Sequence, residues 1–255
     1  NFADDNHTKM MISEVNNTYN FTSMMMNDIN VWITYHDDKQ IEEYSLNKRT
    51  EYKLFKANDT DIEGENINYL NKFYSEICTL YWVYKNRKKS RMVGFCNYRH
   101  LLTDWFDLDD GVCITDPPIQ MSSTIIYNYY KEDHNIFDMI DTTDIINEIY
   151  GDGNKYTRYL LNERVFIGNC CFIMNYGDFE KLCEFLFPIL EKFDRRNNLN
   201  MNFDNYITKA KRDSKYGDVD YQCRALAYLS ERLISCYIYT NMKAISVIKT
   251  GKTAE

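Results

Sequence analysis

The sequence has few of the residues that interrupt regular structure, and it lacks the motifs of several large enzyme classes. Only 3 of its 255 residues are Pro and 9 are Gly. Neither the Gly-x-Gly-x-x-Gly motif of dinucleotide-binding domains nor the phosphate loop Gly-x-x-x-x-Gly-Lys-[Ser/Thr] is present. The Gly-x-Ser-x-Gly elbow is missing too. The sequence therefore argues against those nucleotide-binding folds and against an α/β-hydrolase.

Long apolar runs, paired cysteine motifs and an excess of positive charge are also absent. No stretch approaches the ~20 apolar residues of a membrane span, and no charged and apolar leader is visible. The 38 Asp and Glu outnumber the 30 Lys and Arg, and a net charge of −8 does not suit a nucleic-acid partner. The lack of Cys-x-x-Cys argues against structural zinc. We therefore expect a soluble cytoplasmic protein that does not bind nucleic acid.

Aromatic and apolar residues are plentiful, at 15% and 44%, which is typical of a chain that folds. The eight Cys are scattered and mostly lie in apolar stretches, as buried free thiols do in a reducing compartment. Four Asn-x-Thr sequons, at Asn6, Asn16, Asn20 and Asn58, support the alternative of a secreted glycoprotein with disulfides. The two interpretations differ in whether the thiols are free.

The pattern predicts an N-terminal extension or linker over residues 1–28, with one short helix at 10–15, followed by a single α/β domain over 29–250. The domain opens with strand, helix and strand signals, at 29–35, 71–89 and 92–96. This order is that of a βαβ unit, and ligands of open α/β sheets gather outside the carboxyl ends of its strands.

The second half of the chain gives similar signals. Strands are expected at 165–167, 170–174 and 244–248, and helices at 179–193, with Asp178 as N-cap, and at 218–237. The basic, Asn-rich stretch 195–217 indicates a surface loop. Residues 103–163 give no clear pattern beyond a helical signal at 143–150.

Side chains suited to a phosphate or a sugar follow the strand at 92–96. They are Asn97, Tyr98, Arg99 and His100. Arg offers a planar fork to phosphate oxygens, and His carries a proton near neutral pH. The alternative is a polar junction between strand and loop with a solvated Arg.

A second polar cluster, His36, Asp37 and Asp38, follows the strand at 29–35, where an α/β sheet places a loop for a base or ribose. Its alternatives are a divalent metal site and a solvated turn. Two Asp-x-Asp triplets, at 107–109 and 218–220, are further candidates for Mg²⁺ or Mn²⁺.

Glu231, in the last predicted helix, is a candidate general base, since that role needs a carboxylate within hydrogen-bond reach of an acceptor hydroxyl. A solvated ion pair with Arg224 or Arg232 is the alternative. Asp218 and Asp220 are the next candidates for the base.

Three segments together carry a resemblance to a known family. Residues 66–86 look like its Asn-Ile-Ser, Cys-Glu-Leu-Thr and Tyr-Trp-x-Trp-Lys-Asn run, and residues 93–100 are similar to its Gly-Leu-Cys-His-Tyr-Arg-Arg signature. The third segment joins 168–174 to 229–233. Over about residues 29–240 the chain resembles bacterial capsular-polysaccharide glycosyltransferase-like domains, including galactofuranosyltransferase-like members.

The chain departs from the family pattern at four places. Asn97 stands where the family has His, His100 where it has Arg, Cys170 where it often has Met, and His36-Asp-Asp where it has His-Lys. These departures bear on the charge that binds phosphate and on the choice of donor.

The resemblance implies a GT-A-like single domain with a mixed central sheet flanked by helices. It implies transfer of a sugar, galactofuranose in some members, from a UDP-sugar to a hydroxyl of a growing surface or capsular glycan. A glycan or a lipid-linked glycan would be the acceptor, and the latter would bring the protein to the inner face of the membrane without a transmembrane segment.

The expected mechanism is a single displacement with inversion. Glu231 takes the acceptor proton, while Arg99 and His100, with Arg224 as a further candidate, neutralise the leaving diphosphate. The expected substrate-binding residues are Thr34, His36, Asp37, Asp38, Asn97, Tyr98, Asn169 and Arg224. No metal is expected, because the cationic patch takes its place; dependence on Mn²⁺ or Mg²⁺ is the alternative. The competing function is a non-catalytic nucleotide- or glycan-binding module of a larger capsule-assembly protein.

Overall fold

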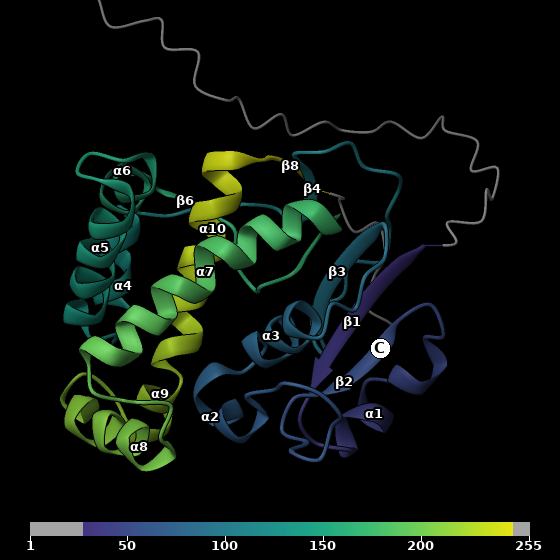
Figure 1. Ribbon diagram of the computed structural model, residues 1–255, viewed down its shortest axis with the longest axis horizontal. Helices are drawn as coiled ribbons and strands as arrows, with labels where there is room; N and C mark the ends of the chain where they lie inside the picture. The colour runs from purple at the N-terminus through teal and green to yellow at the C-terminus, as the bar shows by residue number, and fades with distance from the viewer. Residues whose placement is uncertain (1–27, 247–255) are drawn as a thin grey trace, which may run out of the picture.

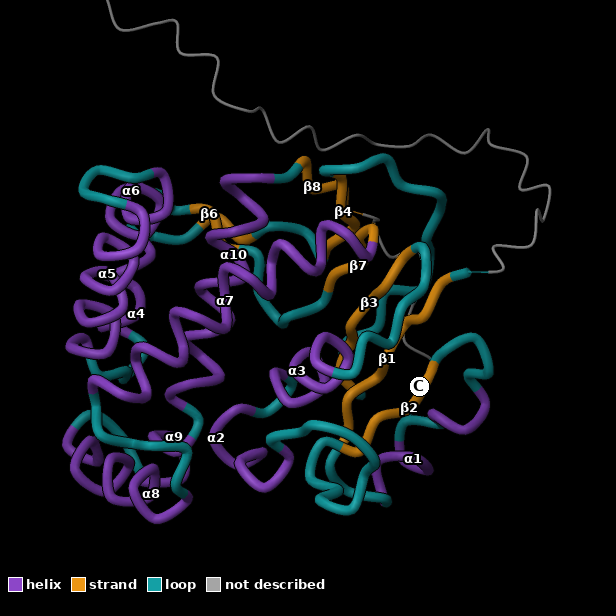
Figure 2. Tube along the Cα trace, viewed as in Figure 1, coloured by secondary structure: helices purple, strands orange, loops and turns teal. Residues whose placement is uncertain are grey.

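The computed structural model describes residues 28–246, and a six-stranded mixed sheet organises them (Figure 2). In spatial order its strands are β2 (Lys53–Lys56), β1 (Ile29–Tyr35), β3 (Met92–Asn97), β7 (Phe172–Asn175), β4 (Val112–Thr115) and β8 (Lys243–Ser246). Only β7 runs antiparallel to its neighbours, which are β3 and β4. The carboxyl ends of the other five strands therefore share one edge of the sheet, and β7 begins at that edge.

β1 and β3 lie inside the sheet because both are apolar enough to be buried on both faces. The two strands pair in parallel, with Thr34 opposite Asn97, so their carboxyl ends lie side by side. Gly94 is required in β3, since a Cβ there would lie 2.7 Å from the side chain of Ile173 on β7. The predicted βαβ unit is confirmed by this pairing.

Helices cover the sheet and extend beyond it on one side. They are α1 (Lys39–Glu43), α2 (Asn71–Tyr74), α3 (Ile77–Lys85), α4 (Ile125–Lys131), α5 (Ile136–Tyr150), α6 (Lys155–Asn162), α7 (Tyr176–Arg196), α8 (Phe203–Arg212), α9 (Val219–Cys223) and α10 (Ala225–Asn241). Figure 1 shows α4, α5 and α6 stacked on the side away from β1 and β2, with α7 running between the two regions. The α/β class and the mixed central sheet flanked by helices are as predicted.

Two apolar cores lie on opposite faces of the sheet. Alternate residues of β1 divide between them: Trp32 enters the larger core, with α3, α7 and α10, and Val31 and Ile33 enter the smaller one. A loop that includes Leu102 and Leu108 closes the smaller core. The sheet is thus covered on both faces, which leaves its carboxyl edge as the open side.

Several predicted boundaries are wrong in ways that matter for the site. The predicted helix at 71–89 breaks at Ser75, which has φ 48° and ψ −124°, and the predicted helix at 218–237 breaks at Arg224 between α9 and α10. Both breaks expose polar groups at the edge of the sheet. The predicted strand at 165–167 is β6 (Val165–Phe166), which pairs with β5 (Ile119–Gln120) in a separate small sheet.

The start of α7 and the nature of 195–217 also differ from expectation. Asn175, and not Asp178, is the N-cap of α7; the Asp178 carboxylate is buried and accepts a hydrogen bond of 2.7 Å from the Gly111 amide. The predicted loop contains α8, whose Lys209 is buried between Asp138 and Asp213 at 2.6 and 2.7 Å. Composition predicts a loop there because the stretch is rich in Lys, Arg and Asn, whereas the helix buries Lys209 together with Tyr206 and Ala210.

The structure tests some of the remaining expectations, and the others concern residues that it does not describe. All eight Cys are buried and free, as the thiol interpretation predicts. The predicted helix at 10–15, the sequons at Asn6, Asn16 and Asn20, nearly all of the 1–28 extension and the end of the 29–250 domain lie outside the described residues. No helix within 28–246 has both the length and the apolar character that crossing a membrane requires.

Candidate functional site

Two adjoining cavities open at the carboxyl edge of the sheet. The larger, about 360 Å³, lies beside the end of β1, and the smaller, about 180 Å³, lies between the end of β3 and α10. Three residues line both cavities: Glu76, Arg99 and Arg224. We call the two cavities together the strand-edge cleft, with a β1 side and an α10 side. Figure 1 shows the arrow of β1 ending at this edge, where α2 also lies.

A tight turn after β3 presents Arg99 to the cleft. The Asn97 side-chain oxygen accepts hydrogen bonds from the amides of Arg99 and His100, both at 3.0 Å, and it is 3.2 Å from His100 Nδ1. Asn97 is itself buried. Such Asx turns fix the backbone without help from other segments. Asn97 therefore shapes the turn, while Arg99 and His100 line the cleft.

Arg99 and Arg224 are exposed cations at the junction of the two cavities. Within residues 28–246, neither guanidinium has a carboxylate within 4 Å. Each lies against a tyrosine ring instead, Arg99 5.2 Å from the centre of Tyr98 and Arg224 5.1 Å from that of Tyr228. Stacking on a ring orients a guanidinium and leaves its donors free. Two forks held in this way suit a polyphosphate.

The opposite wall of the α10 side is a left-handed turn before β7. Asn169 and Cys170 have φ of 67° and 50°, a conformation that costs non-glycine residues roughly 1–2 kcal/mol each. The Asn169 amide donates to Glu231 Oε1 at 2.6 Å, and its side chain donates to Asp116 Oδ2 at 3.2 Å. These contacts from α10 and from the end of β4 hold the strained turn against the cleft.

Glu231 belongs to a chain of charged groups that runs behind the cleft. Its Oε2 lies 3.3 Å from Arg232, which also binds Glu132 at 2.5 Å, and Glu132 is 3.7 Å from His134. Burial raises the pKa of Glu231 above its usual range, against the lowering effect of Arg232 and of the Asn169 amide. Burial likewise lowers the pKa of His134.

The β1 side is lined by fewer of the predicted residues than expected. Thr34 and His36 line it, and the Thr34 hydroxyl is 2.6 Å from that of Thr79. Asp37 and Asp38 line neither cavity: Asp37 accepts from the Lys39 amide, and Asp38 pairs with Lys56 at 2.7 Å. The structure therefore separates these two carboxylates from the other nine predicted site residues, which border the cleft.

None of the carboxylates of the two Asp-x-Asp triplets lines either cavity. Asp107 pairs with Arg91, which precedes β3, so the first triplet lies at the opposite edge of the sheet. In the second, Asp218 caps α9 and Asp220 pairs with Lys72 at 3.5 Å. Within the described part of the chain, no three His, Cys, Asp or Glu side chains gather as a metal site.

Several residues of the cleft were not predicted from the sequence. They are Asn71, Lys72, Ser75 and Glu76 from the break between α2 and α3, Tyr228 from α10, and Asp116, which bonds the turn before β7. Four of these residues lie in segment 66–86, whose resemblance to the family could have marked them as candidates. A helix predicted through that segment conceals the break that exposes them.

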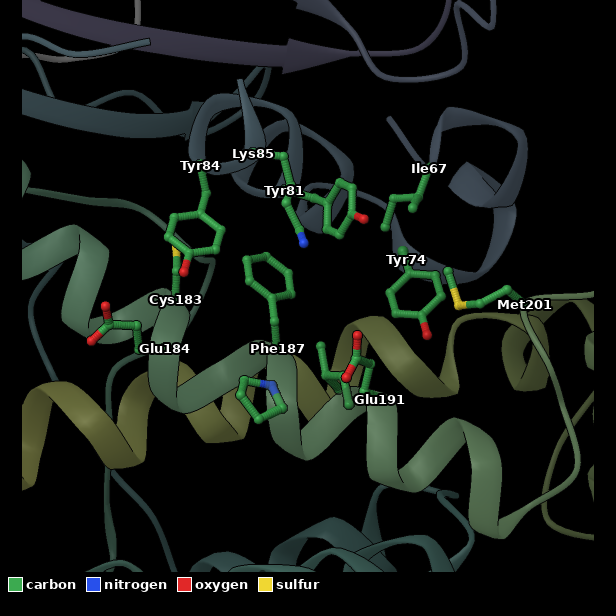
Figure 3. Close-up of a pocket in the computed structure, with 12 residues that line it drawn as sticks. Ile67, Tyr74, Tyr81, Tyr84, Lys85, Cys183, Glu184, Phe187, Glu191 and Met201 are labelled. Carbon is green, nitrogen blue, oxygen red and sulfur yellow. The ribbon is translucent and has the colours of Figure 1, made fainter. Parts of the chain in front are cut away.

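A third cavity, about 240 Å³, lies between α3 and α7 and has different chemistry. Figure 3 shows Tyr81 and Tyr84 facing Phe187, with Glu184 and Glu191 on either side. The ring of Phe187 is 5.3 Å from Tyr81 and 5.7 Å from Tyr84, centre to centre. We call it the aromatic cavity. It has a single cation, Lys85, which pairs with Glu65 at 3.6 Å.

Comparison with known proteins gives a family and a fold. The family described as "Domain of unknown function (DUF4422)" matches residues 31–109 and 104–242. No curated protein matches the chain. A solved structure titled "WbbM bifunctional glycosytransferase apo structure" is similar with a TM-score of 0.63 and 16% identity, over 88% of this chain and 46% of that one. The chain thus spans about half the length of that protein and shares its fold over the matched part.

Proposed function

The chain belongs to the DUF4422 family, a domain of unknown function, and from its cleft we propose that it is a glycosyltransferase. It transfers a sugar, galactofuranose in the first instance, from a UDP-sugar to a hydroxyl of a surface or capsular glycan. The observation that carries the proposal is the pair Arg99 and Arg224, two cations without carboxylate partners among the described residues, at the junction of two cavities. The fold shared with a bifunctional glycosyltransferase supports it.

The diphosphate of the donor binds at the junction, where both guanidinium groups contact it. As the bond from the anomeric carbon to the diphosphate breaks, negative charge grows on the leaving oxygen, and cations fixed beforehand stabilise that charge. His100, at the end of the same turn, adds a donor on the α10 side. Because these groups supply the positive charge, we propose that the reaction proceeds without a metal ion.

The nucleoside occupies the β1 side, beside Thr34, His36 and Tyr98, and the acceptor enters the α10 side, beside Asn169. The attacking hydroxyl must lose its proton to a group in the α10 side, and carboxylates line it. Two carboxylates line that side, Glu76 and Glu231, and Glu231 is the one that the sequence predicts.

Thermal unfolding with nucleotides tests the proposal. UDP, GDP, CMP, UDP-galactose and UDP-galactofuranose are each added with and without Mn²⁺. A ligand at 100 times its Kd stabilises the native state by about 2.7 kcal/mol, which raises the Tm of a protein of this size by roughly 5–10 °C. We expect a shift selective for UDP compounds and independent of Mn²⁺.

The double variant Arg99→Gln with Arg224→Gln is the control, and it should lose the shift. Release of UDP from UDP-galactofuranose then separates a transferase from the alternative binding module, which binds without turnover. If no nucleotide shifts the Tm of the wild-type chain, the proposal is wrong.

A further inference from the structure

Glu76 occupies the position in the cleft where donor and acceptor meet. It shares the border of both cavities with Arg99 and Arg224 alone. Those two residues are cations, so Glu76 is the one carboxylate that faces both the leaving diphosphate and the α10 side. Glu231 and Asn169, by contrast, line the α10 side only.

The Glu76 carboxylate has no bonding partner among the described residues. Within residues 28–246 it has no hydrogen bond and no ion pair, although it is partly buried. Glu76 stands at the N-cap of α3, yet its side chain does not cap the helix. An acidic side chain at the start of a helix is stabilised by the helix dipole or by a cation. Its two oxygens are therefore available to a ligand.

Ser75, directly before Glu76, has a strained backbone conformation that places Glu76 at the cleft. Ser75 has φ 48° and ψ −124°, outside the conformations that a non-glycine residue adopts freely, and such residues cost about 1–3 kcal/mol. A continuous helix through 71–85 would rotate Glu76 relative to Asn71 and Lys72. The break at Ser75 brings all four residues to the cleft.

Glu231 differs because both of its oxygens are already engaged. Oε1 accepts from the Asn169 amide at 2.6 Å, and Oε2 lies 3.3 Å from Arg232. To take a proton from an acceptor it would have to release the left-handed turn of Asn169 and Cys170. Its geometry is that of a residue that holds this turn in place.

We infer that Glu76 is the general base of the transfer and that Glu231 is a positioning residue, an inference that rests on the proposed glycosyltransferase function. The acceptor oxygen forms a bond to the anomeric carbon as its proton passes to a Glu76 carboxylate oxygen. The bond from that carbon to the diphosphate breaks, and its electron pair leaves on the diphosphate oxygen between Arg99 and Arg224.

The test measures UDP released from UDP-galactofuranose with water or with azide as acceptor, together with UDP affinity by calorimetry. Water must lose a proton when it attacks, whereas azide has none to lose. For Glu76→Gln we expect kcat with water to fall at least 100-fold, UDP affinity to stay within twofold, and turnover with azide to stay within about threefold of wild type. The matched control Glu184→Gln, in the aromatic cavity, leaves all three unchanged.

Glu231 is tested by two substitutions that a base and a positioning residue answer differently. Glu231→Gln keeps an oxygen for the Asn169 amide, so turnover stays within tenfold of wild type, whereas Glu231→Ala loses that bond and falls further with both water and azide. If Glu76→Gln keeps wild-type turnover while Glu231→Gln loses it, the inference is wrong and the proposed function stands. If the wild-type chain binds UDP but releases none from the donor with either acceptor, the proposed function fails first.

Discussion

The strand-edge cleft and the aromatic cavity take residues from the same short stretch of chain, 67–85, yet their chemistry is opposite. The cleft receives Lys72 and Glu76, which are polar and partly exposed, and the cavity receives Tyr74 and Tyr81. The break at Ser75 makes this division, because it turns polar residues toward the sheet edge. One side of the segment therefore lines the cleft, where we propose that the substrate binds, and the other side packs against α7.

Substitution of Arg99 should give the largest effect, and it acts on the cleft alone. We expect Arg99→Gln to lower turnover of the UDP-sugar by about 10²–10³-fold, as loss of a preorganised donor to a developing anion does. UDP affinity should fall roughly 10–100-fold, with Tm unchanged. Arg91→Gln is the control, since Arg91 lies at the opposite edge of the sheet and pairs with Asp107. Equal losses in the two variants would mean that Arg99 acts through general charge and not through contact.

A substitution in the aromatic cavity should lower stability and leave UDP affinity unchanged. Phe187→Ala removes a partly buried ring that contacts Tyr81 and Tyr84, and it should cost roughly 2–3 kcal/mol of unfolding free energy, below the range for a fully buried Phe. Urea unfolding measures the loss, and calorimetry with UDP measures binding at a temperature where the variant is folded. UDP affinity should not change. Loss of UDP binding by the folded variant would show that the aromatic cavity and the cleft are not independent.

The chain of charged groups behind the cleft, from Glu231 to His134, should make stability depend on pH. Burial lowers the pKa of His134 from its usual 6.5, so below pH 6.5 the unfolded chain binds a proton that the folded chain does not. His134 should therefore make stability fall as pH drops from 7 toward 5, whereas the raised pKa of Glu231 acts in the opposite direction. Glu132 faces the same ring, but its pKa is lowered, so it loses stabilisation only at more acidic pH.

His134→Phe should flatten this part of the profile. The comparison to make is the slope of unfolding free energy between pH 5 and 7 in the two chains. An unchanged slope would assign the titration to another group.

Removal of divalent metal should have the smallest effect. We expect EDTA to leave UDP-sugar turnover within twofold, because Arg99 and Arg224 stabilise the leaving diphosphate themselves. Turnover that vanishes with EDTA and returns with Mn²⁺ would show that the cations of the cleft do not suffice. Asp116, at the carboxyl edge, would then be the first carboxylate to substitute.

Local patterns predicted the parts of the site that depend on strand order. Residues that follow two parallel strands must meet at one edge, which is why Arg99 and His36 were found from the sequence. The last predicted helix supplied Glu231 and the family resemblance added Asn169, and a hydrogen bond joins these two residues. Asp37 and Asp38 follow the same strand, but their side chains bond to the Lys39 amide and to Lys56. The sequence pattern does not distinguish a residue that lines the cleft from one that makes such local contacts.

The residues that were missed share a different cause. Glu76 and Ser75 lie in a stretch whose apolar spacing continues across the break, so periodicity predicts a helix where the backbone leaves one. Lys209 in α8 is buried with two Asp partners, and its charge makes the segment look like a loop. Backbone strain and buried ion pairs depend on tertiary contacts, which a single sequence does not display.

A crystal structure of the chain with UDP-galactofuranose would test the central claim most directly. The account predicts the diphosphate between the guanidinium groups of Arg99 and Arg224, the nucleoside on the β1 side, and a Glu76 carboxylate oxygen facing the anomeric carbon from the acceptor side. A nucleotide bound in the aromatic cavity, or a diphosphate at the Asp107 edge of the sheet, would contradict it.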